Sequence, residues 1–264
     1  MKNVTLSDFW VTTHDKLSDF YASAWQRGDS AVPLLVVRLI LASVALGILI
    51  WSLCESPSYY WLLYLTNWGM AILTAALLSG LAVSICAVIK KPTTDEATIP
   101  WYMSLYWYLF NVSMSLALMI SALYWLLLFD FSMKKEVSTR FFLLEVATHG
   151  VNSCLVLVEV LATRMPVRLL HMYQPLGVGL WYPIFSIIYY CAGGTDINGF
   201  PFIYPILDWQ HPKRSSIVVV LAVIVMMAIY LVLAGIAFIR NKITEAIFHA
   251  TTVKTSQSND YIIA

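Results

Sequence analysis

Six long apolar stretches, separated by short polar connections, account for most of the 264-residue chain. A helix that crosses a membrane needs about 20 mainly apolar residues. The stretches that meet this length are 34–53, 59–89, 101–129, 141–163, roughly 176–192, and 216–239. The fifth is the weakest because Pro183 lies inside it, although a span tolerates proline where neighbouring groups satisfy the freed carbonyl. The pattern predicts an all-α fold, a polytopic membrane bundle of six transmembrane helices.

The overall composition supports a membrane protein and excludes other classes. Hydrophobic residues make up 60% of the chain and charged residues only 12%, whereas soluble domains carry about 25% charged residues. The net charge of +1 leaves no basic face for phosphates, so nucleic acid is not expected as a partner. The 10 Trp, 15 Tyr and 12 Phe residues fit aromatic belts at two membrane interfaces.

The polar ends of the chain define three regions. Residues 1–33 form an amphipathic N-terminal segment, 34–240 the six-helix transmembrane domain, and 241–264 a tail whose polar end predicts disorder. Apolar residues in 1–33 recur at helical spacing, which fits either a helix lying in the membrane interface or a short helix packed on the loops. Ten Lys and Arg residues fall on the side that carries both termini and five on the other, so both termini should be cytoplasmic.

The connection 193–215 is long and rich in Gly, Pro and aromatic residues. A loop of that length is often functional, but it also fits a lid that packs on the helix ends, and the sequence leaves both interpretations open. Four cysteines are too few for a disulfide framework. Cys54 and Cys191 fall near the outer helix ends, where they could pair or simply be small apolar residues.

Charged and polar residues inside the apolar stretches require an explanation, because each charge costs at least about 2.5–3.5 kcal/mol in a bilayer. Four of these residues fall on one helical stripe, which should face the bundle interior. Counted from Glu145, the others are His149 at 4 positions, Asn152 at 7 and Glu159 at 14. Arg38 and Glu159 each lie about 6 Å below the cytoplasmic surface. A structural Arg38–Glu159 ion pair is the natural way to retain both charges.

Thr66 and His149 are the candidate catalytic residues. Their spans enter from the same side, and they lie about 9 and 12 Å deep, so they can form a nucleophile–base couple. Glu145 or Asn152 would orient the imidazole, and Asn67 or Asn111 would donate to an oxyanion. Spacing alone also fits a structural hydrogen-bond network or a ligand pocket. No metal site or cofactor is predicted, because His149 has no second histidine on its helix and the cysteines are scattered.

Five short motifs resemble the rolling stone family of multi-pass membrane proteins over about residues 30–240. They are YLTNWG at 64–69, HGVNS at 149–153, WYPIFS at 181–186, GGTD at 193–196 and IYPILDW at 203–209. Rolling stone is associated with myoblast fusion in insects, so the resemblance implies a role in cell fusion or contact. The family is distantly similar to the androgen-induced and androgen-dependent membrane proteins, which hydrolyse fatty acid esters of hydroxy fatty acids with an intramembrane Thr and His. Thr66 and His149 match those two positions.

The sequence therefore leads to a hypothesis and two rivals. The hypothesis is an intramembrane Thr/His hydrolase, with an outer-leaflet pocket that binds membrane lipids and cleaves a lipid ester. One rival is a non-enzymatic component of cell–cell fusion or adhesion that works through the 193–215 loop. The other is a lipid-binding or transport protein. Each predicts a protein integral to the plasma membrane or the endoplasmic reticulum, and the sequence indicates no particular protein partner.

Overall fold

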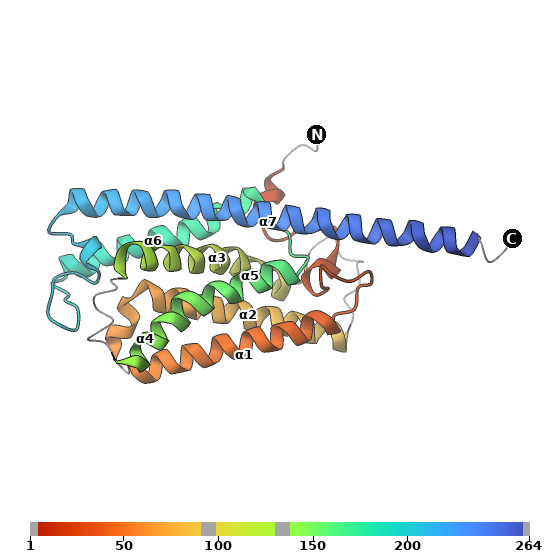
Figure 1. Ribbon diagram of the computed structural model, residues 1–264. Coiled ribbons are helices and arrows are strands. Elements are labelled where there is room, and N and C mark those ends of the chain that lie inside the picture. Colours follow the sequence, from red (N-terminus) through yellow and green to blue (C-terminus); the bar gives the residue numbers. More distant parts are fainter. Residues whose placement is uncertain (1–4, 57, 91–98, 130–137, 261–264) are drawn as a thin grey trace.

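The protein is an elongated bundle of helices (Figure 1). The computed structural model describes residues 5–56, 58–90, 99–129 and 138–260. The described residues form seven α-helices, and their only β-type pairing is an isolated bridge between Ser23 and Thr163. The helices are α1 (Val32–Glu55), α2 (Leu65–Ile89), α3 (Trp101–Leu123), α4 (Thr139–Val146), α5 (Asn152–Ala162), α6 (Tyr173–Cys191) and α7 (Pro212–Asp260). The predicted all-α fold is confirmed.

Five helical segments are long and apolar enough to cross a membrane: Val32–Glu55, Leu65–Ile89, Trp101–Leu128, Thr139–Ala162 and Pro212–Phe248. They make the chain a multi-pass membrane protein. The predicted fifth stretch forms α6, whose 19 residues span about 28 Å, but it does not share the hydropathy of the other five. Polar and weakly apolar residues such as Gln174 and Pro183 account for that difference.

Two helices differ in extent from the predicted spans. The second span begins at Leu65 rather than at 59, because Tyr59–Leu63 forms a separate 3₁₀ turn and Tyr64 takes up an extended backbone. The last helix does not end near 239 but continues to Asp260, since no Gly or Pro follows Gly235 to stop it. As a result α7 projects well beyond the bundle (Figure 1). Some predictions fall outside the described residues. They concern the end of the tail predicted to be disordered, 261–264, and four of the basic residues used to predict orientation, Lys2, Lys91, Lys134 and Lys135.

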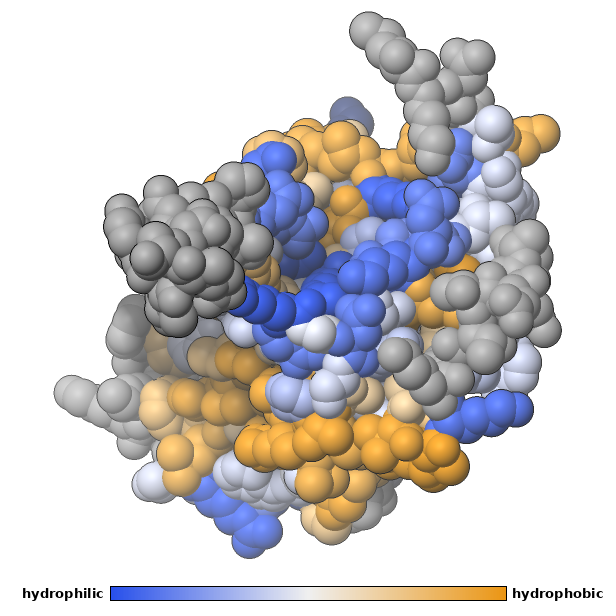
Figure 2. All heavy atoms as spheres, turned by 90° about the vertical axis from the view of Figure 1, so that its right-hand side faces the viewer, coloured by the Kyte–Doolittle hydropathy of each residue, from blue (hydrophilic) through white to orange (hydrophobic). Residues whose placement is uncertain are grey.

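The N-terminal segment is not one amphipathic helix. It forms two 3₁₀ turns, Leu6–Phe9 and Leu17–Phe20, and the second turn is largely buried. Arg164, between α5 and α6, holds the segment by donating from Nη2 to the Gln26 carbonyl over 2.5 Å and by pairing with Asp29. The segment therefore packs on the connections between helices. Hydrophilic residues gather at the centre of this end of the molecule, and apolar residues surround them (Figure 2).

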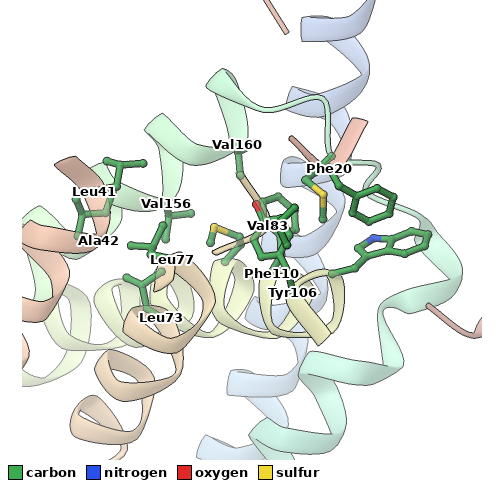
Figure 3. Close-up of a cluster of buried hydrophobic side chains, with 14 of the residues drawn as sticks. Phe20, Leu41, Ala42, Leu73, Leu77, Val83, Tyr106, Phe110, Val156 and Val160 are labelled. Carbon is green, nitrogen blue, oxygen red and sulfur yellow. The ribbon is translucent and has the colours of Figure 1, made fainter. Parts of the chain in front are cut away.

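Helix α3 is the centre of the bundle and positions the other elements. It packs against α2, α5, α6 and α7, and most of its middle residues are buried. Figure 3 shows the core that it forms with α1, α2 and α5, in which Leu77, Phe110 and Val156 meet. On the other side of α3, Leu116, Met119 and Ile120 pack with Met226 of α7. This second cluster lies beside the candidate site.

Candidate functional site

A mainly apolar cavity lies between α3, α6 and α7, toward the end of the bundle where α2 and α7 begin. Its cavity volume is about 90 Å³, and the empty space counted out through its open mouth, which includes solvent, is about 800 Å³. Most lining residues are Leu, Ile, Val and Met. The polar lining residues are Thr66, Tyr124, His149, Tyr182 and Tyr204.

Thr66 reaches the cavity because of the way α2 begins. The extended Tyr64 is the N-terminal cap, so Thr66 is the second residue of the helix, where backbone N–H groups lack helical partners. The Tyr204 phenol lies against this helix start and receives hydrogen bonds from Leu65 and Thr66. Burial raises the pKa of Tyr204 to about 12, although those hydrogen bonds act to lower it. Thr66 is thus nearer its helix terminus than the sequence predicts.

His149 reaches the cavity from a π-helical turn, Ala147–Val151, that separates α4 from α5. Its ring is 3% exposed and stacks on Tyr124, with the ring centroids 3.7 Å apart and the planes within 1°. Tyr124 begins a second π turn, Tyr124–Leu128, at the end of α3. Such turns insert an extra residue into a helix and are frequent at functional sites. The two π turns therefore bring these rings together.

The imidazole of His149 has one occupied and one unoccupied nitrogen. Nε2 lies 3.5 Å from Oε2 of Glu145, at the limit of hydrogen-bond contact, while Nδ1 is buried and has no hydrogen-bond partner in the described part of the chain. The Tyr124 hydroxyl also hydrogen-bonds to Glu145. A carboxylate beside Nε2 favours the tautomer that carries the proton there. Nδ1 is then left with a free lone pair, as a general base requires.

Neither of the two predicted oxyanion donors lines the cavity. Asn67 does not line the cavity; its Nδ2 donates to the Trp61 carbonyl over 2.7 Å. Asn111 also lies outside the cavity lining, and its Nδ2 contacts Oε1 of Gln174 at 3.0 Å and Nδ1 of His171 at 3.2 Å. Both amides already satisfy groups in the protein. The donor near Thr66 is instead the Tyr204 hydroxyl, which the sequence did not indicate.

The predicted polar stripe divides into three environments. Glu145 is half-buried beside His149, and Asn152, although buried, is absent from the cavity lining and leaves its Oδ1 without a partner among the described residues. Asn152 therefore does not orient the imidazole in this structure. Glu159 lies at the opposite end of the bundle, where it pairs with Arg38.

Arg38 and Glu159 are almost completely buried, with side chains 0% and 1% exposed. Both Nε and Nη2 of Arg38 lie 3.0 Å from Oε1 of Glu159. Nη1 also donates to the carbonyls of Phe20 and Gly80, and Nη2 donates to the Tyr106 hydroxyl over 2.6 Å. The guanidinium thus joins the N-terminal segment to three helices, which fits the structural role predicted for the pair.

A second buried histidine lies outside the cavity. His171 belongs to a 3₁₀ turn between α5 and α6, Leu169–His171, and it packs edge-on against Trp107 with the ring centroids 4.8 Å apart. Burial, together with the nearby positive charge of Arg168, lowers the pKa of His171 to about 4. His171 therefore remains neutral in the folded protein at neutral pH.

The connection between α6 and α7 covers the cavity. Tyr204, Ile206 and Leu207 from this connection line it. The indole Nε1 of Trp209 donates to Ser186 Oγ of α6 over 2.9 Å, which fixes the connection on the helix ends. Of the two interpretations of this loop, the structure favours the lid.

The glycines that begin the lid end α6. Gly193 has φ +78°, a conformation that side chains rarely tolerate. The N–H of Gly193 donates to the Tyr190 carbonyl, and the N–H of Gly194 donates to the Tyr189 carbonyl over 2.9 Å. These two hydrogen bonds form a Schellman motif. A Cβ on Gly194 would lie 2.4 Å from the Tyr189 ring. At the end of the same helix Cys191 is a free thiol, as are the other three cysteines.

Comparison with known proteins identifies the family. The family described as "Protein rolling stone" matches residues 2–256, nearly the whole chain. Protein rolling stone of Drosophila melanogaster is 29% identical over 245 residues, which cover 88% of this chain and 87% of the fly protein. No solved structure matches the chain. The likeness therefore extends through the apolar helices, the cavity and its lid, and the chain belongs to the rolling stone family.

Proposed function

We propose that this protein hydrolyses lipid esters within the membrane, with Thr66 as the nucleophile and His149 as the general base. The observation that carries the proposal is that Thr66 and His149, 83 positions apart in the chain, line one apolar cavity. The unpartnered Nδ1 of His149 supplies the base. A threonine hydroxyl is a poor nucleophile unless such a base activates it. The resemblance to intramembrane Thr/His hydrolases points to the same two residues.

The reaction proceeds in two halves. The Thr66 hydroxyl oxygen attacks the ester carbonyl carbon while its proton passes to Nδ1 of His149, and Glu145 stabilises the resulting imidazolium. The Tyr204 hydroxyl, which accepts from the α2 amides, would donate its own proton to the oxyanion. His149 then returns the proton to the departing alcohol and leaves an acyl-threonine. Water, deprotonated by His149, attacks this ester, releases the fatty acid and restores Thr66.

The cavity also bears on the rival functions. A fusion or adhesion component acting through the 193–215 connection would present that loop to a partner, whereas here the loop contributes three residues to the cavity lining. A lipid-binding protein without chemistry would use the same cavity, so turnover is the property that separates it from the hydrolase. We further propose that the chain crosses the membrane six times, with α6 as one of the crossings, and that both termini lie in the cytoplasm. The cavity would then face the outer leaflet. The membrane would be the plasma membrane or the endoplasmic reticulum.

The test is hydrolysis by purified protein in nanodiscs, measured as fatty acid released from esters of hydroxy fatty acids. Thr66→Val and His149→Gln should each abolish turnover and leave the melting temperature near that of wild type. The double variant should be no slower than either single variant, because the two residues act as one unit. Thr74→Val is the matched control, since this buried α2 threonine bonds to the Met70 carbonyl and lies outside the cavity.

Two results would contradict the proposal. One is turnover that survives Thr66→Val. The other is a folded wild-type protein that releases no fatty acid from any ester but binds lipid in the cavity, which would favour the lipid-binding alternative.

A further inference from the structure

We infer that the cavity receives one acyl chain of about six to ten carbons, and that Gly179 and Met226 set this length. The inference rests on the proposed function and names the substrate class that the site would accept. Thr66 lies in the first turn of α2, at one end of the bundle, and the lining that α3, α6 and α7 contribute is mainly aliphatic. An ester bound with its carbonyl at Thr66 would therefore extend one hydrocarbon chain along α6 and α7, away from Thr66.

The depth of the cavity follows from the helices that line it. Along α7 the lining residues run from Val218 to Met226, a descent of about 12 Å. Along α6 they run from Pro183 to Leu176, of which the part from Tyr182 to Leu176 covers about 9 Å. An extended chain of single bonds advances roughly 1.2 Å per bond, as a fully extended backbone does with three bonds per residue. The cavity thus holds roughly seven to ten bonds beyond the reacting carbonyl.

The far end of the cavity is closed by packed side chains. Met226 is 3% exposed and packs with Leu116, Met119 and Ile120 of α3, which are themselves 0–5% exposed. Gly179 faces Met226 directly, because a Cβ at Gly179 would lie 2.7 Å from its Cε. A larger residue at 179 would therefore block the cavity beside Met226, and a smaller residue at 226 would open more space there. Glycine and a flexible methionine together define the floor.

The experiment measures kcat/KM for 4-nitrophenyl esters with acyl chains of 4, 8, 12 and 16 carbons, using the full-length protein in nanodiscs. Wild type should prefer the 8-carbon ester over the 16-carbon ester by at least tenfold. Gly179→Leu should lower the rate on the 8-carbon ester at least tenfold and leave the 4-carbon ester within about threefold. Met226→Ala should move the optimum to 12 carbons.

Gly177→Leu is the matched control, because Gly177 lies on the same helix, outside the cavity lining, with no atom within 4 Å of its Cβ position. Its chain-length profile should equal that of wild type. Should Gly179→Leu fail to fold, the opposite shift in Met226→Ala decides the question. An identical profile in wild type, Gly179→Leu and Met226→Ala would overturn the inference and leave the hydrolase intact.

A readout without chemistry separates this inference from the proposed function. Saturated fatty acids of 4 to 16 carbons are added to the purified protein, and the shift in melting temperature is measured. A maximum near 8 carbons that Met226→Ala moves to longer chains supports the inference even if no ester is cleaved. A shift that grows steadily with chain length in every variant would overturn it.

Discussion

Exchange of Arg38 and Glu159 for leucine, singly and together, tests the burial of charge at the Arg38 end of the bundle. Glu159→Leu leaves a guanidinium with 0% side-chain exposure and no carboxylate beside it, and Arg38→Leu leaves a carboxylate at 1% exposure. Removal of one partner from a buried pair costs about 3–5 kcal/mol, because the other charge stays in a low-dielectric environment. Each single variant should lose that much of its free energy of unfolding.

The double variant loses free energy of unfolding for a different reason. Both charges are gone, but the carbonyl of Phe20 and the hydroxyl of Tyr106 lose the donors that Arg38 supplied. Unsatisfied buried groups of that kind cost about 1–3 kcal/mol. The double variant should therefore be less stable than wild type, but its loss should be clearly smaller than the sum of the two single losses.

The assay is a denaturant titration in detergent micelles, followed by tryptophan fluorescence, which gives the free energy of unfolding of each variant. Glu55→Leu is the control, since it breaks the ion pair with Arg140, whose side chain is 72% exposed, and should cost less than about 1 kcal/mol. A double variant that loses the sum of the two single losses would show that Arg38 and Glu159 act independently, which would refute the reasoning.

Other predictions concern packing, pH and topology. Gly80→Ala should lower the melting temperature despite the better helix propensity of alanine, because the new Cβ would lie 2.8 Å from the Tyr106 ring. Gly47→Ala should raise the free energy of unfolding by about 1 kcal/mol, because no atom lies within 4 Å of the Cβ position at Gly47. The folded pKa of His171, about 4, lies below the unfolded value near 6.5, so the unfolded chain binds the extra proton first as pH falls. The free energy of unfolding should accordingly be highest above pH 6.5 and decrease toward pH 4, and His171→Asn should flatten this decrease in melts at pH 7.5 and 5. Tags at either terminus should be reached by antibody only after the membrane is permeabilised, and a tag accessible in intact cells would contradict the topology.

The helices could be predicted from sequence because a bilayer imposes a minimum apolar length. The proximity of Arg38 and Glu159 could be predicted for a related reason, since an isolated charge in a span is too costly to be left unpaired. The start of α2 could not be predicted from the sequence. The run from Tyr59 to Leu63 is as apolar as the helix that follows, and the break at Tyr64 depends on tertiary contacts such as the hydrogen bond from Tyr182 to the Leu63 carbonyl, 2.8 Å long.

The candidate site was predictable only in part. Thr66 and His149 could be predicted from their polarity and their depth in the spans. The role of Tyr124 could not, because tyrosine is common in these spans. The role of Tyr204 could not either, because a loop that folds over a cavity leaves no periodic signal in the sequence. The π turn at His149 is equally hidden, since a single inserted residue hardly changes an apolar pattern; Gly150 within it is the one local indication. Sequence spacing also cannot show that the amide of Asn67 donates to the Trp61 carbonyl.

Covalent labelling by an alkyl fluorophosphonate reports whether His149 activates the Thr66 hydroxyl. The probe phosphonylates a hydroxyl only where a base activates it, and peptide mass spectrometry locates the adduct. The account predicts one adduct on Thr66 in wild-type protein, and its loss in His149→Gln protein that remains folded. A folded wild-type protein with no adduct on Thr66, or an adduct there that persists without His149, would contradict the account.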